Sequence, residues 1–245
     1  LDDWFPTDDK IVIGWAGLTS HFEDIRRMHA IIKPIHDKYP NTHFVLAGMA
    51  LKDSHIEIHM DEEGNKSFKE IEIEDESLLY KNRIKEIYKD LDPNRFKLFD
   101  ALPLEEYAKF YTLFDINLAY VEHNAFASCK SEIKVIESLH YGCIPVFSEY
   151  GGYRDFWRAA PDRVKHKNMA ISVQSPGPWI NAIGHWVENF EDGKRRAAQL
   201  KEYSDDIYDI NKHCEDRLSF YLQRTEEFNE AQMNMIAQYV DYNGQ

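Results

Sequence analysis

Hydrophobic positions along the chain alternate between short apolar runs and stretches with helical spacing. Ile11-Val12-Ile13-Gly14 is rich in β-branched side chains, which is typical of a strand buried on both faces. Apolar residues then recur every three or four positions from 25 to 35, before a second apolar run at 43–48. A strand, a glycine-containing turn, a helix and another strand form a βαβ unit, so the two strands are predicted to be parallel.

The same alternation continues along most of the chain. Further strands are predicted at 96–99, 115–120, 144–148 and 169–173. Helices are predicted at 76–91, 103–114 and 131–141, and from 178 onward, with a break near Asp192-Gly193. Six strands that alternate with helices predict an α/β fold: a Rossmann-like, doubly wound parallel sheet with helices on both faces.

One segment departs from this rhythm. Apolar and polar residues alternate over 55–61 and 66–74 around Gly64-Asn65, which predicts a solvated hairpin outside the main sheet. His55, Glu57, His59 and Asp61 share one face, but their spacing of about 6.6 Å lets at most a neighbouring pair reach one ion. Asp90-Leu91-Asp92 resembles a manganese-binding motif but closes an amphipathic helix. No metal site is therefore predicted.

Composition and charge narrow the possible partners. The 245 residues include 29 Lys+Arg and 43 Asp+Glu, for a formal charge of −14, which argues against nucleic acid or an anionic membrane as the main partner. No apolar stretch approaches the ~20 residues that a membrane span needs. The three scattered cysteines, Cys129, Cys143 and Cys214, favour a reducing, cytoplasmic compartment.

The chain is predicted to divide into three parts. It opens on Leu1 without an initiator methionine, and residues 1–9 look like the remnant of an interdomain linker. Residues 10–190 carry the α/β alternation and form the predicted Rossmann-like domain. Residues 191–245 form a helical C-terminal extension rich in charged and aromatic side chains.

The predicted helix 131–141 carries the most informative polar residues. With Ser131 as N-cap, the free N–H groups of its first turn, together with Lys130 and Lys134, would suit a phosphate group. Glu137 lies about 9 Å further along the axis on the same face, where it would meet the hydroxyls of an attached ribose. The opposite face, with Ile133, Ile136 and Leu139, is predicted to be buried. An ordinary surface helix with a Lys134–Glu137 ion pair is the alternative.

An ordered set of motifs gives the sequence a family resemblance. The set comprises Ile13-Gly14-Trp15-Ala16-Gly17, Phe44-Val45-Leu46-Ala47-Gly48, Leu102-Pro103-x-x-x-Tyr107, Asn124-x-Phe126, Lys130-Ser131-x-x-Lys134-x-x-Glu137, Gly142-x-Ile144-Pro145-Val146-x-Ser148 and Tyr150-Gly151-Gly152-Tyr153. Between about Lys10 and Phe156 the chain resembles the C-terminal domain of GT-B glycosyltransferases, most closely the retaining glycosyltransferase family 4.

The resemblance implies roles for individual residues. Glu137 matches the second glutamate of the family's E-x7-E motif, which binds the ribose, while Cys129 stands where the first glutamate is expected. The resemblance also implies that Lys130, Ser131 and Lys134 bind the diphosphate of the donor and that Asn124 and Phe126 face its sugar. It further implies that the turn with Gly17, Ser20 and His21 approaches the phosphates, and that the segment with Phe99, Ala101 and Leu102 binds the base. Ser20 is also predicted to open a helix through a capping box with Glu23.

The resemblance also implies an activity. The chain would bind a UDP-, GDP- or ADP-sugar without a metal or other cofactor, for transfer to an acceptor held by an N-terminal domain that this chain lacks. The isolated chain would then bind donor without transferring sugar. One alternative is a non-catalytic nucleotide-sugar-binding or scaffold module that has kept the fold. A flavodoxin-like signalling domain is a weaker alternative, because no acidic cluster follows the first strand.

Overall fold

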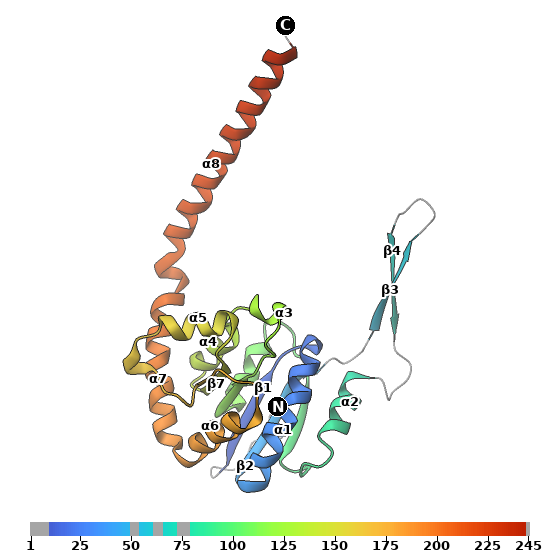
Figure 1. The fold of residues 1–245 in the computed structure, drawn as a ribbon, viewed down its shortest axis with the longest axis vertical. Helices are drawn as coiled ribbons and strands as arrows, with labels where there is room; N and C mark the ends of the chain where they lie inside the picture. Colours follow the sequence, from blue (N-terminus) through green and yellow to red (C-terminus); the bar gives the residue numbers. More distant parts are fainter. Residues whose placement is uncertain (1–9, 50–53, 61–65, 73–78, 244–245) are drawn as a thin grey trace. The chain divides into compact units, whose positions relative to one another are not determined.

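A computed structural model describes residues 10–49, 54–60, 66–72 and 79–243, which divide into two compact units between Tyr203 and Ser204. The first unit contains a six-stranded sheet in the order β5-β2-β1-β6-β7-β8 (Figure 1). Its strands are β1 (Ile11–Ala16), β2 (Thr42–Met49), β5 (Phe96–Asp100), β6 (Ile116–Ala119), β7 (Ile144–Ser148) and β8 (Ala170–Ile171).

Every neighbouring pair in this sheet is parallel, so the predicted Rossmann-like α/β fold is confirmed. The strand order reverses at β1, which pairs with β2 on one side and with β6 on the other. In open α/β sheets, ligands bind outside the carboxyl ends of the strands at such a reversal. The fold therefore directs attention to the segments that follow β1 and β6.

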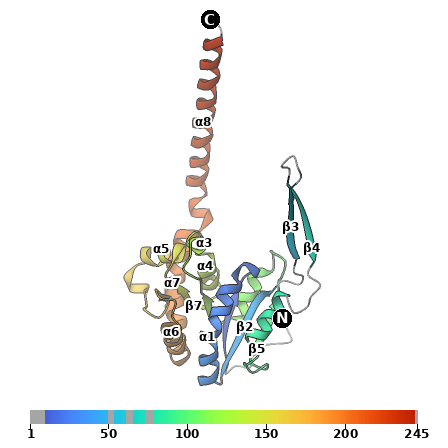
Figure 2. The same cartoon turned by 45° about the vertical axis from the view of Figure 1, so that its right-hand side comes forward.

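Helices cover both faces of the sheet (Figures 1 and 2). Helices α1 (Phe22–Lys38), α2 (Tyr80–Ile87) and α6 (Pro176–Glu188) pack together on one face, while the 3-10 segment η2 (Tyr107–Leu113) and α4 (Ile133–His140) pack together on the other. The remaining short elements of this unit are η1 (Thr19–His21), α3 (Ala125–Ser128), α5 (Gly151–Ala159) and η3 (Asp162–Val164).

An aromatic layer packs between the sheet and η2. Phe110 and Phe114 are buried with Val12, Val45 and neighbouring residues in one hydrophobic cluster. A Cβ at Gly14 would lie 2.1 Å from the Phe114 ring, so only glycine lets this ring approach β1. The tight packing brings η2 against the strand whose carboxyl end forms the candidate site.

Two local predictions in this part of the chain are wrong. Ser20 and Glu23 form no capping box: η1 precedes the helix, His21 is the N-cap without a side-chain bond, and Glu23 pairs with Arg26 instead. The predicted α-helix over 103–114 is a turn followed by η2, because the Tyr107–Leu113 stretch packs its aromatic rings onto the sheet and not along one helical face.

The hairpin prediction is confirmed for its strands. β3 (Ser54–Met60) pairs antiparallel with β4 (Lys66–Glu72), while the predicted turn at Gly64-Asn65 and Asp61 lie outside the described residues. Helix α2 is shorter than the predicted 76–91, of which 76–78 also lie outside the described residues.

The C-terminal part is helical as predicted. The break expected near Asp192-Gly193 lies at Asn189, between α6 and α7 (Phe190–Tyr208). In the second unit, α8 (Ile210–Asn243) exposes several large apolar side chains, namely Leu218, Phe220, Tyr221, Leu222 and Phe228. Within the described residues, no helix combines the length and apolar character that crossing a membrane requires.

Candidate functional site

The candidate site lies at the carboxyl end of β1, where the chain turns at Gly17. A Cβ on Gly17 would lie 2.5 Å from the Trp15 ring and 2.7 Å from the Lys134 amine, so this turn tolerates only glycine without a shift. Gly48, at the end of β2, has φ +93°, and a Cβ there would lie 2.3 Å from the Gly17 carbonyl oxygen. A glycine after β1 and one near the end of the adjacent β2 thus allow the close packing of the turn against α4.

Lys134 projects from the first turn of α4 to the tip of β1. Its Nζ lies 4.3 Å from the centre of the Trp15 ring. Both Nζ of Lys134 and Nε1 of Trp15 are buried, and neither has a hydrogen-bond acceptor in the described structure. A buried hydrogen-bond donor without an acceptor lowers the stability of the fold. Two such donors on side chains that contact each other therefore indicate a binding site where a ligand supplies the acceptor atoms.

The electrostatics of Lys134 follow from this position. Burial, together with the nearby charge of Lys130, lowers the pKa of its amine to about 7. Asp24 and Glu137 act in the opposite direction on the same pKa. An anion placed against the amine would favour its protonated form.

Lys130 reaches the same region from the loop before α4. Its Nζ lies 3.0 Å from Nε2 of His21 and 4.7 Å from the centre of the Phe126 ring. Nδ1 of His21 lies 2.6 Å from Asp24. A lysine amine only donates, so His21 is assigned a proton on Nδ1, donated to Asp24, and accepts from Lys130 through Nε2. Burial lowers the pKa of His21, in agreement with a neutral ring.

Asp24 connects this group to the segment after β6. Its Oδ1 accepts a 2.7 Å hydrogen bond from the backbone N–H of Glu122. Glu122 in turn forms an ion pair with Arg27 of α1. The buried Asp24 carboxylate therefore holds both the His21 ring, in the segment after β1, and the loop after β6. β1 and β6 are neighbouring strands at the strand-order reversal.

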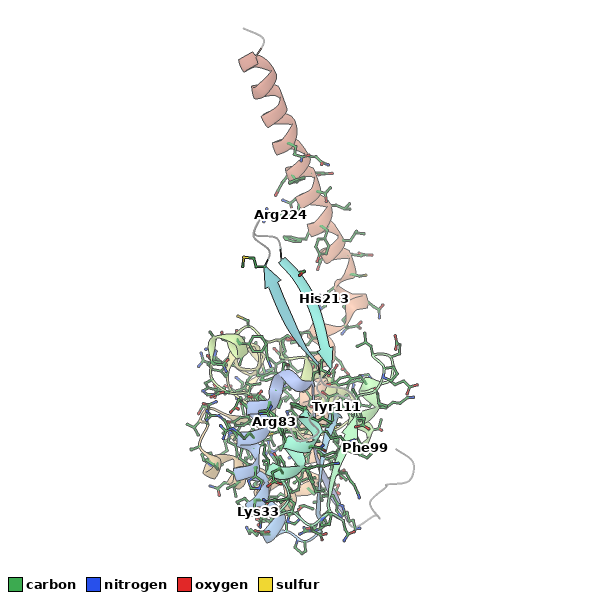
Figure 3. All side chains as sticks on the ribbon, turned by 90° about the vertical axis from the view of Figure 1, so that its right-hand side faces the viewer. Lys33, Arg83, Phe99, Tyr111, His213 and Arg224 are labelled. Carbon is green, nitrogen blue, oxygen red and sulfur yellow. The ribbon has the colours of Figure 1, made fainter. Side chains whose placement is uncertain are left out.

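Glu137 lies one turn beyond Lys134 on α4. Its Oε2 accepts a 2.9 Å hydrogen bond from the hydroxyl of Tyr111, which belongs to η2 and is labelled in Figure 3. Burial raises the pKa of Glu137, while the Tyr111 bond and the charge of Lys134 oppose this rise. The carboxyl group is thus half-buried and held in one orientation, with its second oxygen available to a hydroxyl ligand.

The prediction for α4 needs two corrections. Ser131 is not its N-cap: the helix begins at Ile133 with Glu132 in the cap position, and Ser131 is exposed before it. The predicted buried face was also wrong in part, because Ile133 is 49% exposed while Val135, Ser138 and Leu139 are buried. The buried stripe runs through Val135, Ser138 and Leu139. The N–H groups of Ile133 and Lys134, in the first turn, remain without intrahelical acceptors.

The loop before α4 is held by the start of α5. Gly151 has φ +57°, and a Cβ on Gly152 would lie 2.7 Å from the carbonyl oxygen of Lys130. Asn124 caps α3 by accepting a 2.8 Å bond from the N–H of Ala127. Phe126 is 66% exposed beside Lys130. These contacts place the predicted sugar-facing loop beside Lys130.

The predicted base-binding segment spans the last residues of β5 and the residues after it. Phe99 and Leu102 pack against the aromatic cluster of η2, and Phe99 is labelled in Figure 3. The N–H of Ala101 donates a 2.8 Å bond to the carbonyl of Met49. The segment therefore lies at the same carboxyl edge of the sheet, two strands away from β1.

The structure brings several sequence-predicted residues into one connected group, consisting of Gly17, His21, Phe126, Lys130 and Lys134. Ser20 and Ser131, which adjoin His21 and Lys130 in the sequence, are themselves exposed. Sequence reasoning singled out neither Asp24 nor Tyr111 for the site, since nothing in their spacing links them to α4. Trp15 entered only as part of a motif. No group of three or more potential metal-ligating residues occurs among the described residues.

No protein-family model matches the sequence, and no curated protein matches it. Solved structures do resemble it. The chain is similar to HepE (Alr3699) of Anabaena, solved with UDP and glucose, at TM-score 0.57 and 15% identity, over 86% of this chain and 48% of that one. It is also similar to the C-terminal domain of the group 1 family glycosyl transferase LpcC of Francisella tularensis, at TM-score 0.53 and 15% identity, over 84% and 89% of the two chains.

A third similar structure is TarM, at TM-score 0.59 and 14% identity, over 88% of this chain and 35% of that one. The chain thus spans about half or less of the length of HepE and TarM and most of the LpcC domain. These likenesses show the fold, a Rossmann-like α/β fold that this chain shares with HepE, TarM and the C-terminal domain of LpcC.

Proposed function

We propose that this chain is the donor-binding domain of a GT-B glycosyltransferase similar to family 4, and that it binds a nucleotide-diphosphate sugar at the carboxyl end of β1. The observation that carries the proposal is the pair of buried donors, Lys134 Nζ and Trp15 Nε1, without acceptors at the strand-order reversal. The HepE structure, solved with UDP and glucose, supports the ligand class.

Each part of the donor has a partner of suitable chemistry. Lys130, Lys134 and the free N–H groups at the start of α4 would hold the diphosphate. Glu137, whose carboxyl group Tyr111 orients, would accept hydrogen bonds from the ribose hydroxyls. The segment after β5 would meet the base, and the Asn124–Phe126 loop would face the sugar.

The mechanism that this arrangement supports is electrostatic. When the bond between sugar and diphosphate breaks, negative charge develops on the leaving diphosphate. Lysine amines and helix N–H groups held in a fixed position stabilise that charge more than water does. No residue in the described part of the site is assigned as a nucleophile or base. Retention of configuration and transfer to an acceptor, held by a further domain, are part of the proposal.

Binding of nucleoside diphosphates to the chain tests the proposal directly. Titration calorimetry with UDP, GDP and ADP should give measurable affinity for at least one of them. We expect Lys134→Met to weaken that affinity at least tenfold, because the methionine fills the same space without a donor. Glu137→Gln should weaken it severalfold, since a neutral amide replaces a charged acceptor.

Lys165→Met is the matched control, because Lys165 is a partly exposed lysine outside the group. Its affinity should equal that of the unmodified chain. Absence of binding for all three nucleotides, with the fold intact by circular dichroism, would refute the proposal.

A non-catalytic nucleotide-sugar-binding module is the second candidate. It is favoured by Cys129, an exposed thiol at the position where the resembled family has its first glutamate. If the sugar contact is lost with that glutamate, the module would bind the nucleoside diphosphate and the sugar nucleotide with equal affinity. A donor-binding domain of a transferase should instead bind one particular UDP-, GDP- or ADP-sugar more tightly than the diphosphate alone.

A further inference from the structure

A second group of lysines lies away from the candidate donor site, between α2 and the edge strand β5. Four lysines, Lys81, Lys85, Lys89 and Lys97, line a pocket of about 490 Å³ there. Aromatic and aliphatic side chains complete the lining, and no carboxylate takes part in it. In a chain with a formal charge of −14, such a pocket is an unusual local concentration of positive charge.

Two of these lysines have no acidic partner among the described residues. Lys81 forms an ion pair with Asp100, and Lys89 with Glu86. Lys85 and Lys97 make no ion pair within the described part of the chain, although both line the pocket. The pocket therefore retains positive charge that no described residue compensates.

The pocket runs along an open edge of the sheet. β5 is the last strand in the strand order, and β2 is its one strand neighbour among the described residues. The N–H of Phe44 donates to the carbonyl of Arg95, and the N–H of Ala101 donates to that of Met49. Because alternate residues of a parallel strand bond to the same neighbour, the N–H and C=O groups of Phe96 and Leu98 point away from β2.

An open edge strand can pair with an extended segment of another chain. Lysines along the edge restrict the charge that such a segment can carry. Two copies of this edge would bring lysines against lysines, so pairing of the chain with itself is opposed by repulsion. An acidic strand would meet complementary charge instead. The apolar side chains Tyr88, Leu91, Phe96 and Leu98 in the lining would receive every second side chain of such a strand.

We propose that this edge is a docking surface for an extended acidic segment of a partner protein. The segment adds a strand to β5 through the backbone groups of Phe96 and Leu98. Phe96 faces α2 through its contact with Tyr88, so Lys97 points to the opposite face of β5. Carboxylates on one face of the added strand lie against Lys97, while the side chains on its other face enter the pocket beside Lys85. Backbone hydrogen bonds contribute affinity in this mode, and alternate side chains contribute selectivity.

A labelled eight-residue peptide of alternating glutamate and valine tests the proposal by fluorescence anisotropy with the 245-residue chain. We expect saturable binding that weakens at least tenfold in the variant Lys85→Glu/Lys97→Glu. The matched control, Lys10→Glu/Lys167→Glu, makes the same charge change at two exposed lysines outside the pocket and should bind as the unmodified chain does. A peptide of alternating lysine and valine should not bind.

Strand addition is distinguished from charge attraction by methylating the peptide backbone. In one peptide the valine nitrogens are methylated, and in the other the glutamate nitrogens, so each loses the N–H groups of one edge. Only one edge of an added strand faces β5, so one of the two peptides should lose binding and the other should retain it. Equal binding of the two methylated peptides, or no binding of the unmodified peptide, would overturn the proposal. Equal loss of binding in the pocket variant and in the control variant would overturn it as well.

A membrane surface is the competing source of negative charge. Binding to vesicles of phosphatidylserine and phosphatidylcholine that depends on Lys85 and Lys97, without binding of the peptide, would also overturn the proposal in favour of a lipid surface.

Discussion

The buried amine of Lys134 lowers the stability of the fold but is suited to binding an anion. Its amine is buried against the Trp15 ring without an acceptor, and burial lowers its pKa to about 7. A neutral amine is tolerated there, whereas a charged one needs a counter-ion. The charged and ionisable groups that act on it are Lys130, Asp24 and Glu137. The state of Lys134 should therefore change when an anion binds.

We predict that the chain takes up a proton when it binds a nucleoside diphosphate at pH 8. The bound diphosphate raises the pKa of Lys134, so an amine that is mostly neutral in the free chain becomes charged. Titration calorimetry in two buffers of different ionisation enthalpy measures this uptake, which Lys134→Met should remove. Affinity should also fall from pH 7 to pH 9. Equal proton uptake by the chain and the variant would contradict the prediction.

The same lysine makes a prediction for stability. Its pKa in the folded chain lies below the value of about 10.4 of an unfolded lysine, so between pH 7 and pH 10 the unfolded state binds more protons. The Lys134 contribution to the free energy of unfolding therefore rises with pH over this range. Urea denaturation at pH 7 and pH 9 should show a smaller rise, or a larger fall, for Lys134→Met than for the unmodified chain. Parallel changes would show that Lys134 titrates normally.

Tyr111 supports a further prediction at the residue scale. Its hydroxyl holds the Glu137 carboxyl group, and in Tyr111→Phe that group would lose its donor while the aromatic packing stays. We expect the affinity for the nucleoside diphosphate to fall about three- to tenfold, because the ribose acceptor is no longer oriented. Thr112→Ala, which removes an exposed hydroxyl in the next position, should leave the affinity unchanged. Titration calorimetry measures both.

At the scale of elements, the chain shows why the strands were predictable and the site geometry was not. The apolar run of β1 is buried throughout, and its pattern needs no information from distant residues. The start of α4 depends instead on contacts with Gly152 and on the cap position of Glu132, which spacing does not encode. The burial of Lys134 depends on Trp15, more than a hundred positions earlier. Helical periodicity alone therefore placed Lys134 on an exposed face.

The turn after β1 gives a prediction that concerns two elements together. In Gly48→Ala, the new Cβ would meet the Gly17 carbonyl oxygen at 2.3 Å in a backbone conformation that L residues rarely adopt. We expect a loss of about 2–4 kcal/mol in the free energy of unfolding. Nucleotide affinity should fall as well, because Gly17 contacts Lys134.

Gly177→Ala is the matched control, since nothing lies within 4 Å of a Cβ built on that glycine at the start of α6. Its unfolding free energy should stay within about 0.5 kcal/mol of the unmodified chain. Denaturant unfolding of both variants measures the difference. Equal stabilities would show that the turn can relax without cost.

At the scale of the whole molecule, the first unit contains the complete parallel sheet and every described residue of the candidate site. Trp186, Ala197 and Leu200, from α6 and α7, are fully buried, so the first part of α7 belongs to its core. The second unit begins at Ser204, within α7, and includes α8. Donor binding is therefore assigned to residues before this boundary.

We predict that a chain ending at Tyr208, where α7 ends, keeps the nucleotide affinity of the 245-residue chain within a factor of two. The truncation removes α8 and its exposed apolar side chains while it retains Ala197 and Leu200 in place. Titration calorimetry of both chains with the same nucleoside diphosphate measures the comparison, and urea denaturation reports whether the truncated chain is folded. A chain ending at Asn189, which also lacks all of α7, should by contrast unfold at lower urea, because it exposes the surface that α7 covers. Tenfold weaker binding by a folded chain ending at Tyr208 would instead assign part of the donor site to α8.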